Sequence, residues 1–185
     1  MNMTPAQLAT LKAAILADGT MSAKPMTSGG ALEIAGILNA AAAPVYYVWR
    51  SSTSASEILD AITWASLTPA DAPDGTAIYT NRALACQAKQ MNIQILLQGR
   101  DSLATGRTSV RGGLSDALQN VPSGTGGAVL DAGWAGANKV KAAITRQASV
   151  VEKLFATGNG TTATPSAMGY EGPVSSDDAQ AARES

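Results

Sequence analysis

The chain has 185 residues, of which 45% are hydrophobic, and a formal net charge of −1 at pH 7. This length suits one domain, or one domain with extensions. The chain contains no His and a single Cys, Cys86, which excludes an internal disulfide, Cys-rich zinc sites and a thiol activated by an imidazole base. We therefore expect no catalytic, metal or cofactor site. Aromatic residues make up only 4% of the chain, and much of the apolar content is Ala, so its core should be thin and depend on partner chains.

Charge is segregated along the sequence. Residues 1–80 include 3 basic and 6 acidic residues, residues 81–156 include 9 and 4, and residues 157–185 include 1 and 4. This layout would suit head-to-tail contact between subunits, because opposite charges favour one register. Chance in a near-neutral chain is the alternative, and both interpretations stay open at this point.

The N-terminal third of the sequence predicts helices with one extended segment between them. Thr4-Pro5-Ala-Gln7 is typical of a capping box with Pro in the first turn, and this helix should end at Asp18-Gly19. A second helix is predicted over residues 29–41. Val45-Tyr-Tyr-Val-Trp-Arg50 favours a short extended strand, or a turn against the helices, rather than a sheet, because no second strong strand is evident to pair with it. Ser54-Ala-Ser-Glu57 is a further capping box, and should begin a third helix.

Three more helices are predicted further along, over residues 76–98, 108–120 and 137–156. In the longest of them, four apolar residues recur at helical spacing and are expected to form its buried stripe: Leu84, Ala88, Met91 and Ile95. The residues before it, 67–75, indicate a turn-rich loop in which Asp71 and Asp74 serve turns rather than a cation. Residues 1–156 should therefore form an all-α bundle of five to six helices, with Trp49, Trp64 and Trp134 in its core.

Periodicity stops after Phe155. Residues 157–185 are rich in Gly, Thr, Ser and Pro and have few apolar side chains, so this segment should not offset its ordering entropy by itself. We expect an extended C-terminal tail, distinct from the helical domain of residues 1–156. Its Met168, Tyr170 and Val174 are the candidate residues for binding a partner.

A basic cluster is the other candidate site. Lys89, Arg100, Arg107 and Arg111 could meet phosphates, but few aromatic residues lie near them to stack on bases, and no nucleic-acid reading motif is present. We expect these residues to form salt bridges with a neighbouring subunit, with a solvated face as the alternative. No stretch approaches the roughly 18 apolar residues of a membrane span, and no signal peptide is evident.

Five blocks of the sequence resemble a small structural protein of tailed-bacteriophage virions. They are Met3-Thr-Pro-Ala-Gln-Leu-Ala-Thr-Leu-Lys12, Val45-Tyr-Tyr-Val-Trp-Arg50, Leu67-Thr-Pro-Ala-Asp-Ala-Pro-Asp-Gly-Thr76, Asn81-Arg-Ala-Leu-Ala-Cys-Gln-Ala-Lys89 and Leu154-Phe-Ala-Thr-Gly-Asn-Gly160. They extend from the N-terminus to Gly160 but cover a minority of the residues. Among such proteins, the chain is most similar to the head-to-tail connector, or adaptor, in its size, helical body and C-terminal extension.

This resemblance implies a non-enzymatic protein that is made in the host cytoplasm and becomes part of the virion neck. Adaptors form a twelve-fold homo-oligomeric ring below the portal protein, dock on the portal by the C-terminal extension and receive the tail tube or nozzle. The resemblance also implies that four basic residues face a neighbouring subunit or the DNA channel, in nonspecific contact with packaged DNA: Lys89, Arg100, Arg107 and Arg111. No membrane partner is expected, because the chain has no long apolar stretch. The alternatives are another virion component, such as a capsid decoration or tail protein, and a host-directed regulator that binds a protein or DNA.

Overall fold

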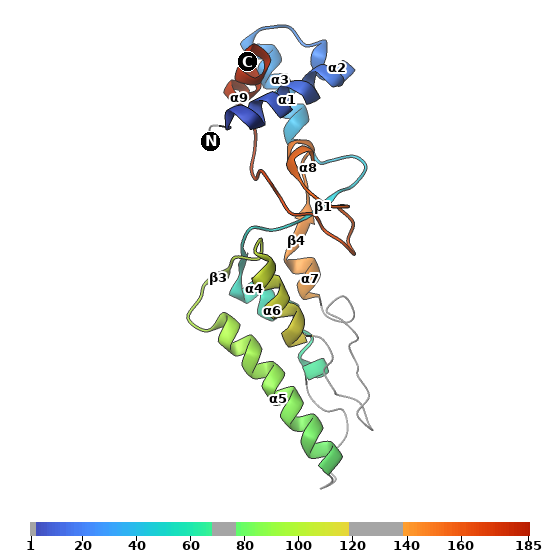
Figure 1. Ribbon diagram of the computed structural model, residues 1–185, viewed down its shortest axis with the longest axis vertical. Helices are drawn as coiled ribbons and strands as arrows, with labels where there is room; N and C mark the ends of the chain where they lie inside the picture. Colours follow the sequence, from blue (N-terminus) through green and yellow to red (C-terminus); the bar gives the residue numbers. More distant parts are fainter. Residues whose placement is uncertain (1–2, 68–76, 119–138) are drawn as a thin grey trace. The chain divides into compact units, whose positions relative to one another are not determined.

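The computed structural model describes residues 3–67, 77–118 and 139–185, and the chain divides into two compact units (Figure 1). Unit 1 comprises residues 1–48 and 147–185, and unit 2 comprises residues 49–146. The predicted all-α class is wrong, because the described residues also form two small antiparallel sheets. The fold is mixed α/β, with helix as the dominant element.

Unit 1 begins with three helices whose starts are fixed by side-chain caps. They are α1 (Pro5–Ala17), α2 (Gly19–Ser22) and α3 (Ser28–Asn39). The predicted capping box of α1 is confirmed, with the backbone N–H of Gln7 donating to Thr4 Oγ1 at 3.3 Å. Asp18 does more than end α1: its carboxylate accepts from the amides of Thr20 and Met21, and so begins α2.

The C-terminal residues, expected as a separate tail, lie in unit 1. They include α9 (Ser176–Glu184), which packs against α1 and α3 (Figure 1). Four of their side chains belong to the core of unit 1, namely Tyr170, Val174, Ala179 and Ala182. The same core contains Leu11, Ile15, Ile34, Leu38 and Val151 from the rest of the unit. The apolar groups of this segment are few, but the first three helices supply the surface that covers them.

Hydrogen bonds fix the C-terminal segment along its length. The side-chain amide of Asn39 donates to the carbonyl oxygen of Val174 and accepts from its N–H, both at 2.8 Å. The Arg183 guanidinium donates to the carbonyl oxygens of Lys24 and Pro25 at 2.8 and 2.9 Å. Gly160 has a φ of 63°, and a Cβ there would lie only 2.2 Å from the Tyr46 ring, so this close approach requires glycine.

The extended segment of the N-terminal third has a strand partner that was not predicted from the sequence. β1 (Tyr47–Trp49) pairs with β4 (Thr145–Gln147), which lies inside the stretch predicted as one helix over residues 137–156. That stretch is instead α7 (Val140–Ala143), β4 and α8 (Val150–Phe155). The break has a local cause, because Ser149 and Glu152 form a capping box that begins a new helix at Val150.

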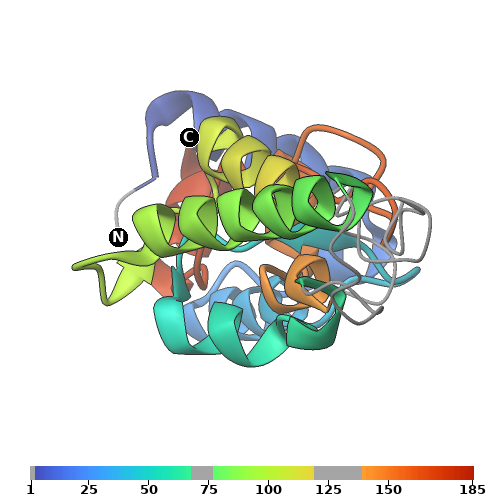
Figure 2. The same cartoon turned by 90° about the horizontal axis from the view of Figure 1, so that it is seen from below.

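Unit 2 is built around its longest helix. Its elements are β2 (Thr53–Ser54), α4 (Ala55–Ala61), the 3₁₀ helix η1 (Trp64–Leu67), α5 (Ala77–Leu97), β3 (Ser102–Leu103) and α6 (Thr108–Leu118), followed by α7. β2 and β3 are antiparallel, with Thr53 opposite Leu103. α6 lies along α5, as Figure 2 shows from below. The capping box at Ser54 and Glu57 is confirmed, whereas Asp71, Asp74 and Trp134 lie outside the described residues.

Neighbouring alanines of α9 test whether the C-terminal segment is packed. Ala182 is fully buried and Ala181 is exposed. Ala182→Asp should destabilise unit 1 by about 1–3 kcal/mol because it buries a carboxylate, whereas Ala181→Asp should have little effect. For a unit of this size, each 1 kcal/mol lowers the thermal midpoint by roughly 4–8 °C. Equal midpoints for the two variants, measured by circular dichroism, would show that α9 is not docked.

Candidate interaction surface

Helix α5 has apolar side chains on two opposite faces. Cys86, Ile93 and Leu97 pack into the core of unit 2 and are 2%, 2% and 9% exposed. The stripe predicted to be buried faces the other way: Leu84, Met91 and Ile95 are 57%, 61% and 60% exposed, and Ala88 is also exposed. The periodicity identified a real stripe but assigned it to the wrong side of the helix. We call the residues Leu84, Ala88, Met91 and Ile95 the α5 ridge.

The α5 ridge is a continuous apolar row. Its members are four, three and four residues apart, so they lie on one face of a helix with 3.6 residues per turn. The row is flanked by exposed amides of Gln87, Asn92, Gln94 and Gln98, and none of these residues is charged. Full burial of a Leu, Ile or Met side chain contributes about 1.5–3 kcal/mol, so covering three that are more than half exposed would be favourable. Rows of this kind typically mark contact sites.

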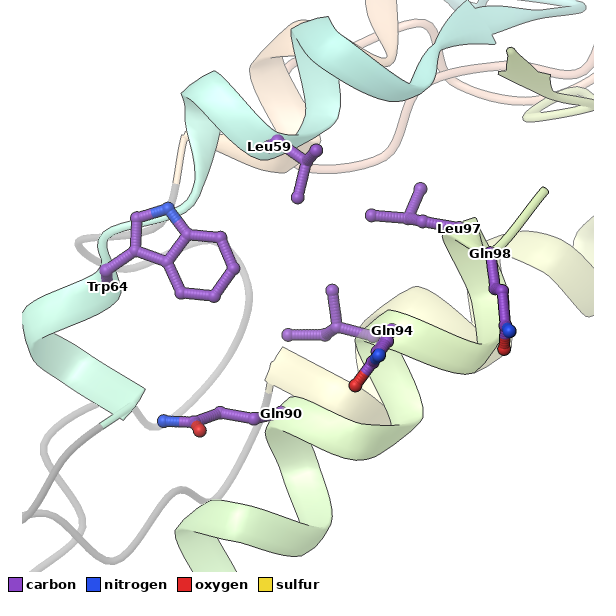
Figure 3. A pocket seen from close by; sticks show the side chains of 7 residues that line it. Leu59, Trp64, Gln90, Gln94, Leu97 and Gln98 are labelled. Atoms are coloured by element: carbon purple, nitrogen blue, oxygen red, sulfur yellow. The ribbon is translucent and has the colours of Figure 1, made fainter. Parts of the chain in front are cut away.

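A groove lies beside the α5 ridge in the same unit (Figure 3). Its volume is about 510 Å³, and it is lined by Leu59 of α4, Trp64 of η1 and a set of α5 residues, Gln90, Ile93, Gln94, Leu97 and Gln98. Leu59 and Trp64 point toward α5 in Figure 3 and are 38% and 48% exposed. The prediction that Trp64 is a core residue is therefore wrong. We call this site the unit 2 groove.

A hydrogen bond joins the two walls of the unit 2 groove. The Nε2 atom of Gln90 donates to the carbonyl oxygen of Leu67 at 2.9 Å, which fixes η1 against α5. Ile93 and Leu97 form an apolar floor, since they are nearly buried. The sequence holds a signal for this site that the predictions did not use, because a glutamine recurs every three or four residues along one side of α5, at Gln87, Gln90, Gln94 and Gln98.

The four basic candidate residues differ in their exposure to solvent and in their contacts. Arg100 and Arg107 are exposed and lie on either side of β3. Lys89 is turned toward the body of unit 2, where its Nζ donates to the carbonyl oxygen of Asp116 on α6. Two of the four are therefore available in unit 2 for contact with a subunit or with DNA, and such contact stays a prediction.

Arg111 is engaged inside unit 2. Its guanidinium donates to the carbonyl oxygens of Thr105 and Gly106 at 3.0 and 2.6 Å and to Thr108 Oγ1 at 3.1 Å. It also lies 4.7 Å from the centroid of the Trp49 ring, a cation–π distance. Burial lowers the pKa of the guanidinium from its usual value. These contacts give Arg111 a role in joining α6 to the preceding loop.

The candidate residues of the C-terminal segment contact their own chain. Tyr170 and Val174 are 6% and 2% exposed, and Met168 is partly buried. The Tyr170 hydroxyl donates to the carbonyl oxygen of Pro173 at 2.9 Å, and its ring lies 5.7 Å from that of Phe155. Burial raises the pKa of Tyr170, and the charges of Asp178 and Glu152 raise it further. Their binding of a partner remains a prediction, and in this conformation Tyr170 and Val174 present little surface to one.

The described parts of the chain hold neither a metal cluster nor a membrane span. Within residues 3–67, 77–118 and 139–185, no cluster of three or more Cys, Asp or Glu is placed to hold a metal ion. None of the helices there is long and apolar enough to cross a membrane. Comparison of the chain with protein-family models, with curated proteins and with solved structures gives no match.

A charged pair fixes the start of α4, which carries one wall of the groove. The Arg50 guanidinium donates to both carboxylate oxygens of Glu57, at 2.9 and 3.3 Å, and to the carbonyl oxygen of Ala143 at 3.0 Å. The hydrogen bond from Arg50, followed by those from the side chain and backbone of Ser54, lowers the pKa of Glu57 from 4.5 to about 2. Glu57 thus both caps α4 and ties it to the end of β1.

Glu57→Gln should make unit 2 less stable at neutral pH, because the amide keeps the cap but loses the charged bond. The folded pKa of Glu57 is the lower one, so its contribution is complete above about pH 4.5 and is lost as the pH falls through about 2. The difference in urea midpoint between the two proteins should shrink over that window. An Arg50→Gln background is the control, and an undiminished difference there would contradict the assigned cause.

Arg111 and Arg107 form a matched pair for the basic cluster. Arg111→Ala should destabilise unit 2 by about 1–3 kcal/mol, because it removes charged hydrogen bonds and a cation–π contact. Arg107→Ala, at an exposed site, should leave the unfolding midpoint unchanged. If Arg107→Ala instead lowers the midpoint and Arg111→Ala does not, the division into a structural and an exposed arginine is wrong.

Proposed function

We propose that the chain is a non-enzymatic structural protein of a tailed-phage virion, a head-to-tail adaptor that closes into a ring between the portal and the tail. The observation that carries the proposal is the pair of exposed apolar sites in unit 2, the α5 ridge and the unit 2 groove. A subunit of an assembly requires such surfaces, whereas a monomer in water leaves them uncovered. The five sequence blocks that resemble virion proteins supply the biological setting.

The distribution of charge between the units supports assembly in one orientation. Unit 1 contains 4 basic and 7 acidic residues, and unit 2 contains 9 basic and 7 acidic residues. The acidic excess of unit 1 comes from residues 147–185, which contain 2 basic and 5 acidic residues, because residues 1–48 contain 2 of each. Opposite net charges on two units favour contact between unlike surfaces of neighbouring copies.

The C-terminal segment is part of unit 1 and is not a free tail, which changes the way in which we propose that it docks on the portal. We propose that the segment docks as a folded surface, through exposed residues such as Glu171, Asp177 and Glu184, rather than as a free tail. Release of α9 would uncover Ala179 and Ala182 and break the bonds of Arg183, so docking in the folded form costs less.

The alternative roles predict different copy numbers. A capsid decoration protein would be present in hundreds of copies per virion, an adaptor in about a dozen, and a host-directed regulator in none. A tail protein could match the adaptor in number but not in affinity for the portal.

The purified chain should form a ring, alone or on addition of the portal protein, and quantitative mass spectrometry of virions should give about a dozen copies. Mass photometry measures the first property directly. A chain that stays monomeric at micromolar concentration and ignores the portal would overturn the adaptor proposal, as would its absence from virions. Glu171→Lys together with Asp177→Lys should weaken portal binding at a temperature where circular dichroism shows the variant to be folded, since both residues are exposed. Asp177 lies in the first turn of α9, so the charge reversal should also lower the unfolding midpoint slightly.

A further inference from the structure

A closed ring with one subunit type requires two different surfaces on each subunit, because each copy contacts its two neighbours through unlike faces. Unit 2 carries two such surfaces, one raised and one hollow. We propose that the α5 ridge of one copy packs into the unit 2 groove of the next copy. This inference rests on the proposed function, and it names the residues that make the ring contact.

The two surfaces are complementary in shape. The α5 ridge offers a row of large flexible or branched side chains, Leu84, Met91 and Ile95, on the outward face of a regular helix. The unit 2 groove runs between α4 with η1 on one side and α5 on the other, and its volume of about 510 Å³ can accept such side chains (Figure 3). Packing a row of side chains into a groove between helices is a usual way for helices to associate.

The two surfaces are also complementary in chemistry. The residues that line the groove are apolar or carry amides, and the ridge is flanked by amides as well, so no charge has to be buried when they meet. Side-chain amides both donate and accept hydrogen bonds, which lets Gln87 and Asn92 beside the ridge pair with Gln94 and Gln98 at the groove of the next copy. A contact between identical chains would otherwise risk repulsion between like charges.

The arrangement around α5 allows one copy to use both surfaces at once. A helix turns about 100° per residue, which places Gln90, Gln94 and Gln98 roughly a quarter-turn from the α5 ridge. The ridge and the groove of one copy adjoin along Gln94 and Gln98 but consist of different apolar side chains, so filling the groove leaves Leu84, Met91 and Ile95 for contact with another copy. Repetition of such a contact extends an assembly from copy to copy until it closes, as a ring needs.

Two single variants and their mixture test this contact. Met91→Glu blocks the ridge but leaves the groove intact, and Trp64→Glu blocks the groove but leaves the ridge intact. Each variant alone should be monomeric, with assembly reduced at least tenfold, whereas an equimolar mixture should form one heterodimer that cannot extend. Leu32→Glu is the matched control, because Leu32 is 65% exposed but lies in unit 1, and it should assemble like the wild type. Circular dichroism checks that each variant is folded, and Leu59→Glu is a second groove variant.

The outcomes separate this contact from the proposed function. If the Trp64→Glu variant pairs with itself through its intact ridge, the contact is symmetric and the ridge-to-groove inference is wrong. If the variants form the same portal-bound ring as the wild type, the inference fails while the adaptor proposal stands. If the mixture gives heterodimers but the wild type neither closes into a ring nor binds the portal, the contact is correct and the adaptor proposal is wrong. If the wild type never self-associates, another protein covers these surfaces and the inference is overturned.

Discussion

Closure of the unit 1 core by the C-terminal segment is the constraint on which the first unit depends. Helices α1 and α3 carry the apolar side chains of Leu11, Ile15 and Ile34. Helix α9 packs against both helices, and Tyr170 and Val174 join the same core. The Asn39 amide ties the C-terminal segment to the end of α3, because it satisfies both backbone groups of Val174. Without α9 the small alanine-rich core would be open to water on one side.

The two units bury their apolar side chains in different ways. Unit 1 recruits residues from both ends of the chain and covers most of its large apolar side chains. Unit 2 relies on one long helix that buries Cys86, Ile93 and Leu97 on one face and exposes a second apolar row on the other. In an isolated subunit, one face of a helix with two apolar faces stays exposed to water. Binding of another chain to that face stabilises the folded subunit. Stability and assembly are thus coupled in unit 2.

Local signals predicted most of the helix starts, because a cap depends on residues only three positions apart. Thr4 with Gln7 and Ser54 with Glu57 marked α1 and α4, and the bounds of α5 followed from the turn residues that precede Thr76 and from Gly99 after its end. Ser149 with Glu152 and Ser175 with Asp178 are the same signal, and using them would have divided the last predicted helix and revealed α9. The pairing of β1 with β4 joins residues about a hundred positions apart, and no local pattern contains it.

The side of α5 that faces the core could not be decided from periodicity. Both rows repeat at helical spacing, and the row with larger side chains, which includes Leu84 and Met91, is the exposed one. What decides burial is the position of α6 and η1, which pack on α5, and Cys86 and Ile93 lie in the core that results. The unit 2 groove has the same origin, because its walls come from segments that only the tertiary fold brings together. Periodicity therefore identified the residues of the surface but placed them on the wrong side of the helix.

The division of the chain sets an order of events during translation. Unit 2 is one continuous stretch that ends at Arg146, whereas the core of unit 1 includes Ala182, 36 residues later in the numbering. At about 5–20 residues per second, the ribosome adds that difference in roughly 2–7 s. During this interval the first three helices have emerged but lack α9, while unit 2 already has all of its residues. A segment translated after unit 2 thus completes a core whose first helices were translated before it, and unit 2 can fold while that core is still incomplete.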